Sequence, residues 1–299
     1  MTSIKTKKIL SKAGYYIFVS LLAFAMCYPL IWMLCSSFKE TNTIFAKETS
    51  LIPDPFVLKN YPNGWKGFGG ISFATFFKNS GFVTVLSTIG IVASSTVTAY
   101  GFARIRFPGS KIWFSCMLLS MMIPFQVLMV PQYMMFNLFG WTGTYLPLIV
   151  PSFFINGFGI FLTVQFIKGI PRDLDEAAKI DGCSTYTIFL RIIVPLIVPA
   201  MVTNGIFAFI GKWDDFMSAL LYLNKPQQYT LALALKLFCD PSSTSDWGAM
   251  FAMAIRSPRL PVAWRTGNSA ARALIPVFLI FAFFQKYLVE GISASGLKG

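Results

Sequence analysis

The sequence predicts an all-α fold, a polytopic membrane bundle of six transmembrane helices whose sixth helix is interrupted by a polar segment. Three observations support this class. Hydrophobic residues make up 55% of the 299 residues and charged residues only 12%, whereas about a quarter of a soluble domain is charged. Apolar runs recur at about the 20-residue length that a bilayer-spanning helix needs. No acidic residue lies within these runs.

The first five spans are expected at residues 15–36, 79–103, 112–135, 145–167 and 192–211. The stretch from 112 to 167 carries no charge and is too long for one span, so we expect a turn where Gly and Thr cluster near residue 142. Small residues recur four apart in the second span, which lets helices approach closely in a bilayer. The first span is too long to be the apolar part of a signal peptide, so we expect it to be uncleaved.

The sixth span looks cut in two. Residues 247–254 and 273–288 are each too short to cross a bilayer but together reach about 20 apolar residues. The segment between them, 255–272, holds four Arg and two Pro. Each Arg at mid-bilayer costs roughly 3 kcal/mol, and proline breaks helices. We therefore expect 255–272 to be either an insertion or a natural loop that shifts the span.

The charge pattern predicts orientation and excludes several chemistries. The formal net charge is +13, and Lys and Arg are dense in residues 1–13, 104–111 and 168–191. Basic loops stay in the cytoplasm, so both termini are expected there. The chain has no histidine, which excludes His-based catalysis and His-ligated metals, and its five cysteines show no CxxC spacing. We expect no catalytic residue and no metal site.

A short polar helix is expected within residues 171–191, between the fourth and fifth spans. Pro171 breaks the preceding apolar helix. Asp173 is expected to cap a new helix, with Glu176 reaching back as in a capping box. Gly182 can adopt positive φ and end that helix after about two turns. Ser184 can then cap the next helix, which runs toward the membrane.

One face of this helix is small and smooth, which suits docking into a groove of another protein. Its expected members are Leu174, Ala177, Ala178 and Asp181. The simpler alternative is an ordinary polar connection between two spans.

The segment resembles the EAA loop of permease subunits of bacterial ABC importers. The resemblance is carried by Glu176, Ala177, Ala178, Gly182, Ile192, Val194 and Pro195. Val194 departs from the usual Leu of that pattern, and Cys183 stands where Ala is common; neither changes the expected geometry. The chain as a whole looks closest to the maltose-type carbohydrate permeases, except in 255–272.

This resemblance implies a carbohydrate permease of the bacterial plasma membrane. It would form the translocation path with a second permease and work with two ATPase subunits and an extracytoplasmic solute-binding protein. The chain itself would bind no cofactor, because ATP and Mg²⁺ belong to the ATPase partner. The implied ATPase contacts are Glu176, Ala177, Ala178, Asp181 and Gly182, with Gly296 and Lys298 in the cytoplasmic tail 286–299.

Four residues are candidates for the sugar path, because aromatic faces and hydrogen-bonding groups suit sugars. They are Gln165, Asn204, Trp213 and Asp214, the last standing where that family has Asn. Each could instead be an interfacial anchor or an interhelical hydrogen-bonding group.

Two other functions stay open at this point. One is an ion-coupled secondary transporter or a channel, which usually carries carboxylates or polar ion sites within the membrane. The absence of acidic residues from the predicted spans argues for an outside energy source. The other is a membrane-embedded enzyme, but no cluster of nucleophile, base or metal ligands is evident.

Overall fold

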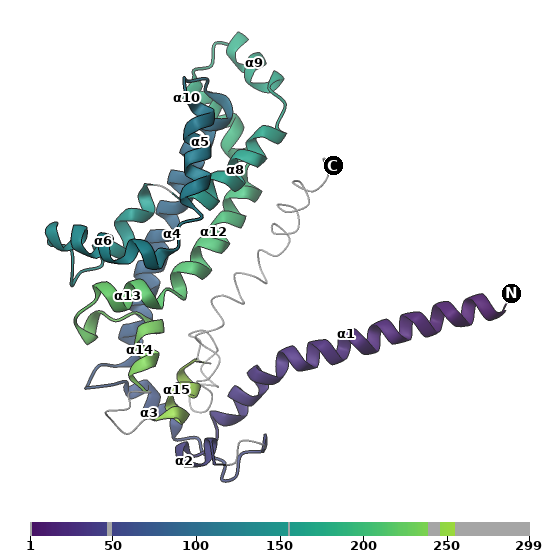
Figure 1. Cartoon of the computed structure of the whole chain (residues 1–299), viewed down its shortest axis with the longest axis vertical. Helices are drawn as coiled ribbons and strands as arrows, with labels where there is room; N and C mark the ends of the chain where they lie inside the picture. The colour runs from purple at the N-terminus through teal and green to yellow at the C-terminus, as the bar shows by residue number, and fades with distance from the viewer. Residues whose placement is uncertain (1, 47–49, 155, 239–245, 255–299) are drawn as a thin grey trace. The chain divides into compact units, whose positions relative to one another are not determined.

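The structure is a computed structural model that describes residues 2–46, 50–154, 156–238 and 246–254. Helices dominate this part of the chain, and no β-strand occurs in it. The chain divides into two compact units (Figure 1). The first is made of two parts of the chain, the described residues up to Gly70 and those from Leu237 on, and the second is formed by Ile71–Lys236. Three predicted segments lie outside the described residues: 255–272, 273–288 and the tail 286–299.

Among its described residues, the first unit has one long apolar helix and three short ones. α1 (Thr2–Ser36) contains the first predicted span. Its most apolar stretch is long enough to cross a membrane, and none of that stretch is buried within the chain. A fully exposed apolar helix is the form expected of a span covered by lipid or by another membrane protein. The short helices are α2 (Thr41–Ile44), α3 (Asn60–Lys66) and α15 (Trp247–Ala254).

Close packing of α3 on α15 forms the centre of this unit. A Cβ placed on Gly248 would lie 2.5 Å from Nδ2 of Asn60, so only glycine permits this approach. That Asn60 nitrogen donates to the carbonyls of Ser37 and Lys39 at 2.9 and 2.8 Å. Asp246 caps α15 by accepting from the Ala249 amide at 2.9 Å.

The second unit is built around α4 (Phe73–Arg104), whose 32 residues extend about 48 Å at 1.5 Å per residue. α4 packs along α8 (Gly157–Gly169) and α12 (Val198–Trp213). The close packing expected of its small residues is confirmed at Gly90, where a Cβ would lie 2.7 Å from the Phe153 ring. The short elements between these helices are α7 (Leu146–Ile149) and the 3₁₀ turn η1 (Val150–Phe153).

The third predicted span, 112–135, is bent. The chain forms α5 (Ser110–Ser120) and α6 (Phe125–Leu138), which meet at an angle of 100°. Pro124 stands at the bend as the residue before α6. Proline lacks an amide donor and disfavours helical backbone in the residue before it, so the helix is interrupted there.

The fifth predicted span, 192–211, is also bent. α12 supplies most of it, and the preceding helical segment 185–196 meets α12 at 73°. That segment comprises α10 (Thr185–Ile188), the π-helical turn η2 (Phe189–Ile193) and α11 (Val194–Leu196). Pro195 and Pro199 flank the bend, and each removes one backbone donor from the helical ladder.

Within the described residues, three helical segments are long and apolar enough to cross a membrane, or five if each bent pair is one span. One of the three is 146–169, at the place of the fourth predicted span. The predicted count of six is not confirmed, because the second half of the sixth span lies outside the described residues.

The remaining helices of the second unit are α9 (Asp173–Ile180), α13 (Phe216–Tyr222), the 3₁₀ turn η3 (Pro226–Gln228) and α14 (Leu231–Leu237). Figure 1 shows α9 and α10 at one end of this unit and α13 and α14 at the other.

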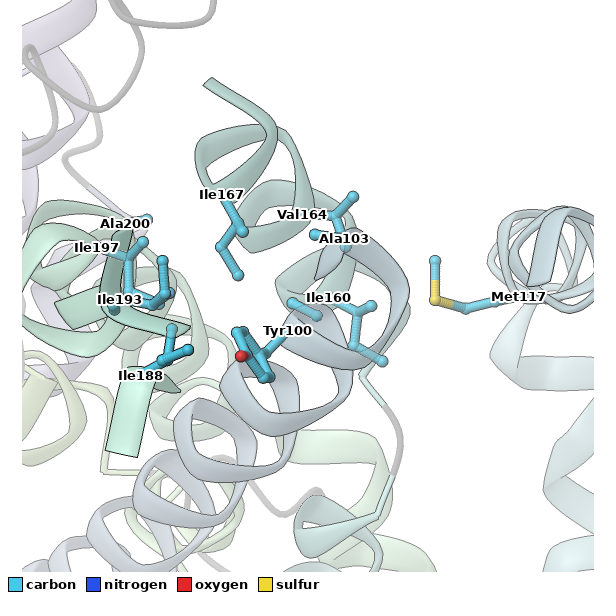
Figure 2. Close-up of a cluster of buried hydrophobic side chains, with 12 residues drawn as sticks. Tyr100, Ala103, Met117, Ile160, Val164, Ile167, Ile188, Ile193, Ile197 and Ala200 are labelled. Atoms are coloured by element: carbon cyan, nitrogen blue, oxygen red, sulfur yellow. The ribbon is translucent and has the colours of Figure 1, made fainter. Parts of the chain in front are cut away.

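Near the α9 end, an apolar cluster joins α4, α8 and the bent 185–200 segment (Figure 2). Tyr100 and Ala103 of α4 meet Ile160 and Ile167 of α8, with Ile193 from the π-helical turn. Buried Ala178 of α9 belongs to the same cluster. The short polar helix is therefore packed onto the apolar core of the second unit.

Candidate functional site

The short polar helix expected within 171–191 is present as α9, between α8 and α10. Its end follows the sequence closely. Gly182 has φ of 80°, in the left-handed region. The Cys183 amide donates to the Ala178 carbonyl at 2.9 Å, and the Gly182 amide donates to the Lys179 carbonyl at 3.0 Å. These two bonds form a Schellman motif, which suits glycine at this position.

The start of α9 differs from the prediction. Asp173 is the first helical residue rather than the cap, and the cap position belongs to Arg172, which makes no side-chain capping bond. The capping box with Glu176 is therefore absent. Three acidic residues in the first turn still favour this helix through its dipole: Asp173, Asp175 and Glu176. The cap predicted at Ser184 is present, because its hydroxyl accepts from the Thr187 amide at 3.2 Å.

A buried ion pair fastens α9 to the end of α4. Nε of Arg104 lies 2.9 Å from Oδ2 of Asp175, with only 5% and 12% of the two side chains exposed. Arg104 also donates from Nη2 to the Ile170 carbonyl at 2.9 Å. In return, Arg172 donates to the Ala103 carbonyl at 3.3 Å. The short segment between α8 and α9 is thus tied to the last turn of α4 at both Ile170 and Arg172.

The outer face of α9 combines acidic and apolar groups. Glu176, Ala177 and Asp181 are exposed, as expected for residues that contact a partner. Ala178 is buried, so its predicted place on the same exposed face is wrong. The ion pair rotates α9 so that Asp175 and Ala178 point inward. The apolar residue exposed near the end of α9 is Ile180, which is 87% accessible.

The four candidates for a sugar path do not gather in one place. Trp213 is 7% exposed and stacks on Phe209, with ring centroids 5.6 Å apart, so it is a packing residue. Gln165 and Asp214 are exposed, and neither lines the cavity described next. Asn204 is 1% exposed and does line it.

A polar cavity of about 200 Å³ lies where α4, α8 and α12 meet. Its polar lining is Asn156, Asn204, Lys212 and Asp215. Nδ2 of Asn204 has no hydrogen-bond partner within the described residues, and a buried unsatisfied group of this kind costs about 1–3 kcal/mol. A group kept at that cost within a membrane helix marks a candidate functional site.

Sequence reasoning missed three of these four residues. Asn204, Ala208 and Lys212 lie four apart on α12, so their shared face could have been recognised from helical spacing. Asn156 gave no such signal. It caps α8 by accepting from the Gly159 amide at 2.7 Å.

Comparisons with known proteins identify the chain. Residues 87–293 match the family model described as "Binding-protein-dependent transport system inner membrane component". The matched region includes α9, the cavity and most of α4. The chain belongs to this family. It is accordingly a multi-pass membrane protein of an ABC transport system, and the family resemblance expected from the Glu176–Gly182 segment is confirmed.

Individual relatives agree with this assignment. The probable ABC transporter permease protein YurM of Bacillus subtilis is 32% identical over 99% of this chain and 91% of its own length. The arabinooligosaccharides transport system permease protein AraQ of the same organism is 30% identical over 95% of this chain and 94% of its own. A chain of a bacterial ABC transporter involved in import of the acidic polysaccharide alginate has the same fold, with TM-score 0.72 and 20% identity over 93% of this chain and 96% of that one.

Proposed function

We propose that this chain is the permease subunit of an ATP-binding-cassette importer for a sugar or oligosaccharide, and that α9 couples it to a separate ATPase. The observation that carries the coupling role is the attachment of α9. An amphipathic helix presents Glu176 and Ala177 outward while a buried ion pair fixes it to α4. A force applied to α9 therefore reaches a rigid 32-residue helix.

The carbohydrate cargo is supported by the relatives. AraQ is named for arabinooligosaccharides and matches this chain over nearly its whole length. A second permease, two ATPase subunits and an extracytoplasmic solute-binding protein complete the proposed importer. ATP and Mg²⁺ bind to the ATPase, where ATP is hydrolysed, and this chain carries no catalytic residue. Gly296 and Lys298 stay proposed contacts of the cytoplasmic tail with the ATPase.

Positive charge supports the proposed orientation. The end of α4 and the loop after it carry Arg104 and Arg106, and the segment from the end of α8 through α9 carries Lys168, Arg172 and Lys179. Basic residues next to membrane spans favour the cytoplasmic side, where an ATPase can reach α9. The tail and the N-terminus share that side in this arrangement.

Two neighbouring alanines provide the test. Ala177 is exposed and Ala178 is buried against the core of the second unit. In the purified importer, Ala177→Cys should cross-link to a cysteine placed in the ATPase partner, and Ala178→Cys should not. If Ala177→Cys fails to cross-link in an importer that still transports, α9 does not contact the ATPase and the coupling role is refuted.

The transport assay separates this proposal from a secondary carrier or a channel. In proteoliposomes, the complete importer should accumulate sugar only with ATP on the side of the ATPase. Accumulation without ATP, driven by a proton or sodium gradient, would favour the carrier.

A further inference from the structure

We propose that the cavity between α4, α8 and α12 binds one uncharged sugar ring of the transported carbohydrate, and that Asp215 disfavours acidic sugars there. This inference rests on the proposed function, because it takes a carbohydrate as the cargo. It assigns the specificity contacts to Lys212 and Asp215, neither of which was expected from the sequence, beside Asn204 in the lining.

The size and mouth of the cavity suit a single ring. Its volume of about 200 Å³ is below the roughly 300–1,000 Å³ of pockets that enclose drug-sized ligands. Phe158 and Phe207 both line it and are 42% and 45% exposed. Their rings meet edge to face, with centroids 5.4 Å apart. Such aromatic groups offer an apolar surface to the C–H face of a sugar, beside polar groups deeper in.

The polar groups have bonding capacity left for hydroxyls. Asn204 lines the cavity, but its Nδ2, which has no partner among the described residues, is itself buried, so the hydroxyl contacts are assigned to the two charged groups. The Lys212 ammonium has three donors and uses one on the Leu148 carbonyl at 3.3 Å. Asp215 accepts from the Ser218 amide at 3.0 Å through Oδ1, and a carboxylate has further acceptor sites. Donors and acceptors together match a sugar hydroxyl, which does both.

The charge of the cavity selects against an acidic ring. Lys212 and Asp215 contribute one positive and one negative group, so the lining is neutral overall. Burying a carboxylate is unfavourable unless an opposite charge compensates it. Here the only cation among the lining residues is already balanced by Asp215. An uncharged sugar needs no such compensation.

Gly211 offers a direct way to close the cavity. It lines the cavity, and a Cβ on it would meet nothing within 4 Å, so a larger side chain enters open space rather than the core. Gly81 of α4 is a matched control, because its Cβ also meets nothing within 4 Å and it does not line the cavity. The variants are Gly211→Leu and Gly81→Leu in the complete importer.

The probes are labelled maltotriose, arabinotriose and α-1,4-galactotriose, with trigalacturonate as an acidic counterpart that differs from galactotriose at C6. Uptake is measured in proteoliposomes with ATP. We expect Gly211→Leu to lower uptake of the preferred neutral sugar at least tenfold and Gly81→Leu to leave it unchanged. Equal uptake by Gly211→Leu and the wild type would overturn the inference.

Asp215→Asn is the second test, and it does not depend on Gly211→Leu folding. Asn keeps the cap on α13 and removes the charge. The lining then carries a net positive charge, so acidic-to-neutral uptake should rise about tenfold. An unchanged ratio, or a wild type that prefers trigalacturonate, would overturn the role of Asp215. A wild type that assembles with its ATPase and imports none of these sugars would refute the proposal of a carbohydrate cargo, and the proposed sugar subsite would be refuted with it.

Discussion

The ion pair between Arg104 and Asp175 should hold α9 against α4, and Asp175→Leu should release it. The two side chains are 5% and 12% exposed, so the remaining Arg104 charge would be left largely buried. Removing one partner of a buried pair costs about 3–5 kcal/mol. At 1.36 kcal/mol per factor of ten, the lower value raises the population of detached α9 about 100-fold.

Hydrogen exchange on the purified importer measures this directly. Amides of 173–180 should exchange about 100-fold faster in Asp175→Leu, because local opening of α9 becomes easier. ATP hydrolysis should continue while sugar uptake falls, since the ATPase then moves a helix no longer fastened to α4. Asp173→Asn is the control: Asp173 is exposed in the same turn, and surface changes stay within about 0.5 kcal/mol.

A double-mutant cycle tests whether the pair itself is responsible. Arg104→Met combined with Asp175→Leu replaces two charges by apolar groups, which is often nearly neutral. The double variant should therefore be less damaging than the sum of the single variants by about 1–3 kcal/mol. Effects that add within about 0.5 kcal/mol would refute the argument, because independent sites behave that way.

Three further predictions concern local structure. Gly159→Ala should destabilise the second unit by about 1–3 kcal/mol, because the added Cβ would lie 2.5 Å from Oγ of Ser95. The readout is a lower melting temperature. An unchanged melting temperature would show that the surrounding side chains move aside without cost. Ser184→Ala should speed exchange in α10 by removing about 1 kcal/mol of capping, whereas Ser184→Asn should not. Deleting 255–272 should join 247–254 to 273–288 as one span and improve thermal stability and uptake; a deletion that transports worse would show that the segment belongs.

Local sequence signals predicted α9 well but not its rotation. The end of the helix depends on Gly182 alone, because positive φ is a property of that residue. Which side of α9 faces inward depends on Arg104, 71 positions before Asp175 (175 − 104). No periodicity within 171–191 carries that information, so helical spacing alone places Ala178 on the wrong face.

The same distinction applies to the spans and the cavity. Apolar composition located the helical segments, but it is insensitive to the bends near Pro124 and Pro195, which leave the hydropathy high. Trp213 and Asn204 looked alike as polar or aromatic groups on one apolar helix. Packing separates them, because Trp213 stacks on Phe209 and Asn204 lines a cavity between three helices.

ATP-driven movement is proposed to enter this chain through α9, and the Gly182→Val variant tests that route. No atom lies within 4 Å of a Cβ at Gly182, so the substitution acts only through its φ of 80°. Left-handed backbone costs an ordinary residue about 1–2 kcal/mol. Gly169→Val is the control, because that exposed position is equally open and has no positive φ.

The measurement is sugar imported per ATP hydrolysed, in proteoliposomes containing the complete importer. Gly182→Val should hydrolyse ATP but import about 5- to 30-fold less sugar per ATP, which is that strain converted at 1.36 kcal/mol per decade. Gly169→Val should match the wild type. Unchanged import per ATP by Gly182→Val would contradict coupling through α9.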